Sequence, residues 1–148
     1  MVDLGKLYPP FVTKILQLQA NCKALGFDYR ITSGLRSHAE QDALYAIGRT
    51  TGTPGSYVTK AKSGQSYHNF AVAVDFARIV NGKAVWSKSD YTTLGAEAAK
   101  LGLVWGGSWA SFVDLPHVQW NVKLGALQAA YAGGAGIPGV WKMLDAAK

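Results

Sequence analysis

A predicted β-hairpin is the sequence feature that most restricts the fold of this chain. Residues 72–79 form a mainly apolar segment that is typical of a strand, Asn81-Gly82 follows it, and residues 84–86 form a second, shorter apolar run. An Asn-Gly pair between two such runs is typical of a tight turn that joins antiparallel strands. We therefore expect a mainly antiparallel sheet, with a further short strand over residues 28–32.

Four segments predict helices. Residues 9–25 carry an apolar stripe, open with two prolines and stop at Gly26. Ser37 and Glu40 match a capping box, which predicts a helix over 38–47. A third helix is expected at 91–101, capped by Asp90 or Ser89, and a weak one at 124–132, followed by a Gly-rich tail. Strands interspersed with helices predict an α+β fold, a small sheet flanked by helices.

Length and composition favour a single folded domain over residues 1–148. Apolar residues make up 49% of the chain and charged residues 16%, far from the profile of a disordered protein. Cys22 is the only cysteine and falls on the apolar stripe of the first helix, which favours a buried structural role. The segment 48–65 is rich in Gly, Thr and Ser and predicts a long surface loop of the kind that often lines a binding site.

Charge and hydrophobicity limit the partners of the chain. Its net charge is +6, but the basic residues are scattered, so the pattern indicates an anionic environment and argues against nucleic-acid binding. No segment reaches the length of a membrane span, and the N-terminus lacks the pattern of a signal peptide. We expect a chain made in the cytoplasm, without stable membrane insertion.

His68 and Asp75 are candidate metal ligands, but their spacing requires a turn between them. On one strand, seven residues span about 23 Å and place the two side chains on opposite faces. On a helix the same separation is about 10 Å. We therefore expect a turn at Asn69-Phe70. From there on, Ala71, Ala73 and Asp75 share a small-residue face with room for a metal; the alternative is that Asp75 is an ordinary solvent-facing carboxylate.

The segment around His117 supplies further candidates. Pro116 favours an extended chain, which would place His117 and Gln119 on one face and Val118 on the other. Asp114, three residues before the histidine, is able to reach the same pocket through the bend at residues 115–116. Two histidines, one carboxylate and a water form a typical catalytic zinc site, whereas the HExxH pattern of other zinc peptidases is absent.

These residues resemble a known family. The segment from Ser66 to Asp75, SYHNFAVAVD, resembles the SxHxxGxAxD motif of the D-Ala-D-Ala dipeptidases and carboxypeptidases, with Ala71 in place of the motif glycine. Together with SGLRS at 33–37, LYAIGR at 44–49 and the block from Trp105 to His117, it is similar to the L-alanyl-D-glutamate peptidase branch found in phage endolysins. The similarity covers about residues 8–121.

The resemblance implies a set of site residues. Zinc (Zn²⁺) is expected on His68, Asp75 and His117, with Asp114 as the catalytic acid and base. A second group would act on the substrate: Arg36 would stabilise charge, and Gln41 and Ser66 would line the site. Taken alone, these three have simpler explanations, namely a surface contact for Arg36, a solvated helix position for Gln41, and a turn or cap for Ser66.

The resemblance further implies hydrolysis of the L-Ala-D-Glu bond in the stem peptide of peptidoglycan. The chain would be a monomeric phage endolysin, made in the host cytoplasm, that lyses the bacterial cell wall and has anionic envelope polymers as further partners. Two alternatives stay open: a D-Ala-D-Ala carboxypeptidase or dipeptidase, and a non-catalytic zinc or wall-binding module in which Ala71 is a sign of decay.

Overall fold

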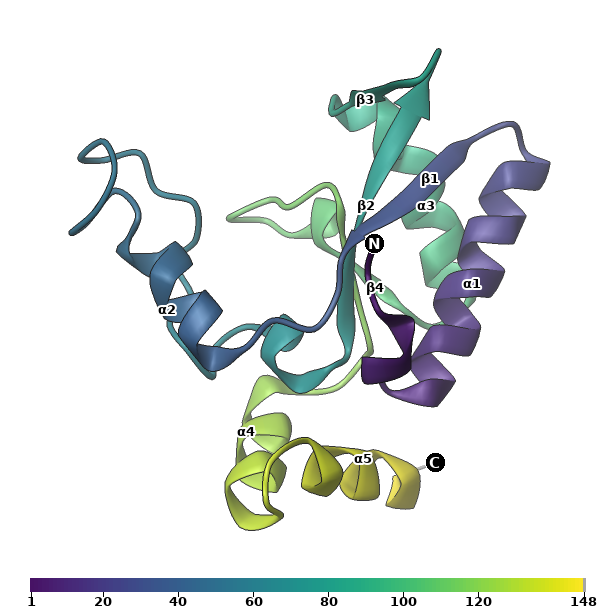
Figure 1. The fold of residues 1–148 in the computed structure, drawn as a ribbon. Helices are drawn as coiled ribbons and strands as arrows, with labels where there is room; N and C mark the ends of the chain where they lie inside the picture. Colours follow the sequence, from purple (N-terminus) through teal and green to yellow (C-terminus); the bar gives the residue numbers. More distant parts are fainter. Residues whose placement is uncertain (148) are drawn as a thin grey trace. The chain divides into compact units, whose positions relative to one another are not determined.

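The computed structural model describes residues 1–147 and divides into two compact units (Figure 1). The first unit consists of Met1–Gly34 and Val72–Asn121, and the second of Leu35–Ala71 and residues 122–147. The expectation of one catalytic domain over residues 1–148 stays a prediction. No helix among the described residues has the length and apolar character that crossing a membrane requires.

An antiparallel sheet forms the centre of the first unit, which confirms the predicted α+β class. All its pairings are antiparallel and follow the order β1-β2-β5-β4, with β3 paired to the far end of β2. Asn81 and Gly82 have positive φ values of 52° and 77°, as a hairpin turn with two left-handed residues requires. The strands are β1 (Asp28–Ser33), β2 (Ala73–Val80), β3 (Lys83–Val85), β4 (Val104–Trp105) and β5 (His117–Gln119).

Helices α1 (Pro9–Ala24) and α3 (Lys88–Lys100) pack side by side and flank the sheet (Figure 1). The predicted stripe of α1 is buried, including Cys22. Burial, with a smaller effect of Glu97, raises the pKa of the Cys22 thiol to about 11, so the side chain is an uncharged core residue. Two short 3₁₀ helices, η1 (Leu4–Lys6) and η3 (Gly106–Ser108), complete the unit.

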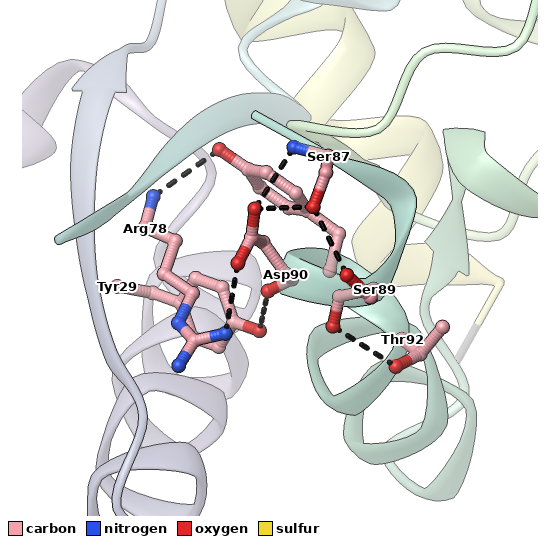
Figure 2. A network of polar contacts seen from close by, with 7 residues as sticks. Tyr29, Arg78, Ser87, Ser89, Asp90 and Thr92 are labelled. Atoms are coloured by element: carbon pink, nitrogen blue, oxygen red, sulfur yellow. Dashed lines mark hydrogen bonds and ion pairs between the residues drawn. The ribbon is translucent and has the colours of Figure 1, made fainter. Parts of the chain in front are cut away.

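Helix α3 begins earlier than its sequence suggested. The N-cap is Ser87, not Ser89 or Asp90, because Asp90 occupies the third helical position and completes a capping box with Ser87. Figure 2 shows the Asp90 carboxylate between Ser87 and the Arg78 guanidinium, which lies 3.2 Å away on β2. The Tyr29 hydroxyl donates to the Asp90 carbonyl oxygen, so this network ties α3 to two strands.

The second unit is mainly helical. It contains α2 (His38–Ala46), η2 (Tyr67–Phe70), α4 (Leu124–Gly133) and α5 (Ile137–Ala146). The capping box predicted for α2 is present. The Gly-rich tail expected after α4 was wrong: Pro138 suits a first helical turn, and Val140 and Leu144 lie one turn apart and are buried.

Residues 48–65 form the predicted loop, with one isolated bridge between Ile47 and Thr51. Arg49 holds this loop against α2. Its guanidinium lies over the rings of Tyr45 and Tyr57, and it donates to the carbonyl oxygens of Tyr45 and Thr59. The loop therefore has an internal anchor despite its lack of regular structure.

Candidate functional site

Asp75 and His117 lie directly opposite each other in the paired strands β2 and β5. Their side chains share one face of the sheet, and Nδ1 of His117 lies 3.6 Å from Oδ1 of Asp75. The His117 side chain is 6% exposed and the Asp75 side chain 24%, so the imidazole is withdrawn from water while the carboxylate keeps partial access to it. The first unit therefore brings together an imidazole and a carboxylate, two of the side chains from which metal sites are built.

The alanine residues that share a strand face with Asp75 are buried in the structure. Ala71 and Ala73 are both fully buried, as are the residues of the opposite face, Val72, Val74 and Phe76. Pairing with β1 on one side and β5 on the other encloses β2. The small side chains of Ala71 and Ala73 are thus part of the packed interior beside Asp75.

Asp114 lies just before β5 and faces the same histidine. Its Oδ2 is 3.9 Å from Nδ1 of His117, and its side chain is 47% exposed, far more than the histidine. Asp114 therefore combines contact with the buried imidazole and access to solvent, as proton exchange with water requires.

The Trp105-Gly106-Gly107 segment sets the path of the chain that carries Asp114. Trp105 Nε1 donates to the carbonyl oxygen of Leu115 at 2.7 Å, and Asp114 N donates to that of Gly106 at 3.1 Å. A Cβ on Gly106 would collide with the Asp114 carbonyl oxygen and lie 3.1 Å from His117 Cβ. A glycine is required there because the two backbones approach so closely.

Electrostatics around His117 favour a positive charge at Nδ1. Nε2 lies 2.7 Å from Oε1 of Gln119, while Nδ1 faces the carboxylates of Asp75 and Asp114. Burial by itself would lower the pKa of His117, but Asp75, with smaller effects of Gln119 and Asp114, raises it above its usual value. Both a bound proton and a metal cation are compatible with this arrangement.

His68 belongs to the second unit and lies in the short turn η2. Ser66 caps this turn by accepting from the His68 amide, and Asn69 completes the capping box. Ala71 ends the turn in the left-handed conformation, with φ 63° and ψ 27°. The sharp turn predicted between His68 and Asp75 is therefore present, and the His68 side chain is 3% exposed.

Arg36 and Gln41 form one connected network in the second unit. The Arg36 guanidinium donates to Oε1 of Gln41 at 3.0 Å, and Nε2 of Gln41 donates to the carbonyl oxygen of Ala61 at 2.7 Å. Gln41 is fully buried, unlike the solvated helix residue that was the simpler alternative. The Arg36 amide donates to the carbonyl oxygen of His68, so the backbones of these two candidate residues are joined.

Asn69 and Gln119 are buried polar residues beside the candidate ligands, and the sequence indicated no function for either of them. Asn69 accepts from the amides of Gly64 and Ser66 and donates to the Arg36 carbonyl oxygen, which holds three segments of the second unit together. Gln119 contacts His117. The alternation of side chains along β5 predicted that Gln119 and His117 share a face, but no sequence pattern indicated a hydrogen bond between them.

Comparison with known proteins identifies relatives of the chain. A family model described as D-alanyl-D-alanine carboxypeptidase matches residues 59–120. The peptidoglycan L-alanyl-D-glutamate endopeptidase CwlK of Bacillus subtilis (strain 168) is 41% identical over 112 residues, which cover 69% of this chain and 66% of CwlK. The L-alanyl-D-glutamate peptidase of Listeria phage A118 is 44% identical over 63 residues, 40% of this chain and 22% of the phage protein. The chain thus spans about two thirds of one relative and a fifth of the other.

Solved structures share the fold. The Serratia marcescens L-Ala D-Glu endopeptidase ChiX superposes with a TM-score of 0.59 at 24% identity, covering 80% of this chain and 83% of ChiX. The D,D-pentapeptidase VanY from a VanB-type resistance cassette, an E175A mutant in complex with Zn(II), gives 0.60 at 16% identity, covering 90% and 83%.

Proposed function

Because the chain belongs to the zinc peptidase family of the D-alanyl-D-alanine carboxypeptidases and L-alanyl-D-glutamate peptidases, we propose that it hydrolyses the stem peptide of peptidoglycan. The bond cut is the one between L-Ala and D-Glu. The names of the two relatives support this bond, and CwlK matches the greater share of the chain. The proposed activity makes the protein a lysin of the bacterial cell wall.

The proposed metal ligands are His68, Asp75 and His117. Each offers one ligand atom, and two imidazoles with one carboxylate are a donor set that catalytic zinc sites use. Two ligands on one zinc ion lie about 3.4 Å apart, since each bond is about 2.1 Å long. The 3.6 Å between His117 Nδ1 and Asp75 Oδ1 fits that value. A zinc ion held there would supply Lewis acidity, which polarises a peptide carbonyl and makes water a stronger nucleophile.

Asp114 is proposed to move the proton. Its carboxylate accepts a proton from the attacking water and returns it to the leaving amine, for which its partial exposure and its contact with His117 suit it. Arg36 is proposed to stabilise negative charge that develops on the substrate carbonyl oxygen. In this scheme Gln41 fixes the Arg36 guanidinium, and Ser66 shapes the turn that carries His68.

The observation that carries the proposal is the cluster of Asp75 and His117 on one sheet face, with Asp114 beside them just before β5. The test is Asp114→Asn, which keeps size and polarity but removes the proton acceptor. We expect the release of new amino termini from purified sacculi to fall about 10²- to 10⁴-fold, with zinc binding unchanged. Asp145→Asn, on the exposed side of α5, is the matched control. Wild-type lysis by Asp114→Asn would contradict the mechanism.

A second candidate, cleavage of terminal D-Ala-D-Ala, is favoured by the description of the matching family model. Mass spectrometry of digested sacculi separates the two activities. Free D-Ala with intact L-Ala-D-Glu bonds would establish the carboxypeptidase and overturn the preferred specificity. Muropeptides that begin with D-Glu would establish the endopeptidase. Binding to sacculi without any cleavage would establish the non-catalytic wall-binding module.

The proposed setting is that of a phage endolysin. The protein would be a monomer, made in the host cytoplasm, that meets its substrate in the wall or periplasm during host lysis. The net charge of +6 supports retention near anionic envelope polymers. Sedimentation of the protein with sacculi, with and without teichoic acid and at increasing salt, tests this part separately from catalysis.

A further inference from the structure

Gln119 is a buried polar residue that the proposed reaction leaves without a role. Its Oε1 lies 2.7 Å from Nε2 of His117, and the two residues are 6% and 5% exposed. They are two positions apart on β5 and so share a face of the sheet. Because β5 lies between β2 and β4, its backbone is fixed on both sides.

The neighbouring strand leaves room for the glutamine. Gln119 pairs with Ala73 in β2, while His117 pairs with Asp75. A larger residue than alanine at position 73 would compete with the Gln119 side chain for the same face. The small side chain of Ala73 thus leaves the space in which the Gln119 side chain contacts His117.

The contact decides which nitrogen of His117 carries a hydrogen. A carbonyl oxygen only accepts, so the bond to Oε1 of Gln119 requires the hydrogen on Nε2. In the neutral imidazole the lone pair then lies on Nδ1, which faces Asp75 and Asp114 at 3.6 and 3.9 Å. An Nδ1 lone pair opposite two carboxylates is repulsive, and either a proton on Nδ1 or a metal cation between these groups relieves the repulsion.

We propose that Gln119 is a positioning residue, which accepts the Nε2 hydrogen of His117 and thereby directs the Nδ1 lone pair at the metal. This inference rests on the proposed function, since it assumes that His117 is a zinc ligand. Partners of this kind fix the ring of a metal-bound histidine, and their loss weakens metal binding about 10- to 100-fold.

The test measures zinc affinity of the full chain by competition with a chromophoric chelator. Gln119→Leu removes the acceptor, whereas Gln119→Glu keeps an acceptor oxygen at the same reach. We expect the Leu variant to bind zinc about 10- to 100-fold more weakly and the Glu variant to match or exceed the wild type. Gln17→Leu, at an exposed position of α1, is the matched control and is expected to change nothing.

A second readout follows the histidine itself. Long-range ¹H–¹⁵N spectra of the zinc-loaded wild type should show His117 with its hydrogen on Nε2 and zinc on Nδ1. Equal affinity of Gln119→Leu and the wild type, equal weakening in both variants, or zinc on Nε2 would each overturn the inference. A wild type that binds no zinc would contradict the proposed function itself, which separates the two failures.

Discussion

Ala71 has a backbone conformation that residues with a Cβ adopt at a cost. Its φ of 63° and ψ of 27° lie in the left-handed region, which costs a non-glycine residue about 1–2 kcal/mol. The position ends η2, where the chain turns towards Asp75, and the motif that this segment resembles has glycine there. The structure therefore gives the physical reason for the motif glycine and shows that alanine occupies the same turn.

We expect Ala71→Gly to leave the free energy of unfolding within about 1 kcal/mol of the wild type. Relief of the left-handed strain is offset by the loss of a buried methyl, about 0.8 kcal/mol, and by the entropy of glycine, about 0.5–1 kcal/mol. Ala73 is equally buried but lies in β2, so Ala73→Gly loses the methyl and gains the entropy cost of glycine without any relief of left-handed strain. We expect it to destabilise the fold by about 1–2 kcal/mol. Equal urea midpoints for the two variants would contradict this account of Ala71.

At the scale of elements, η3 closely approaches the chain before β5, beside Asp114. In Gly106→Ala, a Cβ at position 106 would push the backbone of η3 away from Asp114 and His117, because the atoms that it meets there are backbone and Cβ atoms and not the ends of flexible side chains. We expect about 1–3 kcal/mol of destabilisation and a loss of wall hydrolysis.

Gly125→Ala is the control for Gly106→Ala. Gly125 lies in α4, a Cβ there meets nothing within 4 Å, and helix propensity predicts a gain of up to about 1 kcal/mol. Thermal unfolding and sacculus digestion of both variants provide the measurement. A Gly106→Ala variant that is as stable and active as the Gly125→Ala variant would show that the close approach is unimportant.

The start of α3 gives a prediction about acid stability. The hydrogen bond from Ser87, and to a lesser extent the Arg78 charge, hold the pKa of Asp90 below its usual value, although desolvation opposes this. A carboxyl with a depressed pKa in the folded state stabilises fully above its unfolded pKa of about 3.9, and this stabilisation is lost as pH falls through the folded value.

Ser87→Ala should therefore raise the pKa of Asp90 and flatten the dependence of unfolding free energy on pH below about pH 4. Carboxyl titration by NMR and urea unfolding between about pH 2 and 6 provide the measurement. An unchanged Asp90 titration in Ser87→Ala would show that the serine is not the main cause.

Local patterns predicted most elements because they depend on neighbours in sequence. The stripe of α1, the capping box of α2 and the Asn-Gly hairpin are all present where the sequence placed them. The first turn of α3 and the whole of α5 were not predicted. Several residues before α3 are equally good helix caps, so the sequence did not fix its first residue. The glycines before α5 suggested an irregular tail, and the helical spacing of its apolar residues became clear only from their burial.

Long-range pairing explains what the sequence left open at the candidate site. Spacing predicted the turn after His68, but only the register of β2 and β5 brings Asp75 opposite His117. The bond between His117 and Gln119 and the buried position of Gln41 depend on side-chain geometry. Composition and periodicity carry no information on such geometry.

At the scale of the whole molecule, zinc should act as a stabilising ligand if the proposed ligands are correct. A ligand present at 100 times its dissociation constant stabilises the folded chain by about 2.7 kcal/mol. For a chain of this size we expect the melting temperature to rise by about 5–10 °C when zinc is added to chelator-treated protein. Chelation should abolish wall hydrolysis, and added zinc should restore it.

The histidines offer a matched test of this prediction, since the chain has three of them. His68→Ala removes a proposed ligand and should abolish most of the zinc-induced rise in melting temperature. His38→Ala removes a histidine of the same unit that packs against Tyr131 and Phe70 and is not a proposed ligand. That variant melts lower because it loses packing, but its zinc-induced rise should match that of the wild type. If His68→Ala kept the full rise, the proposed ligand set would be wrong even if the protein still bound zinc.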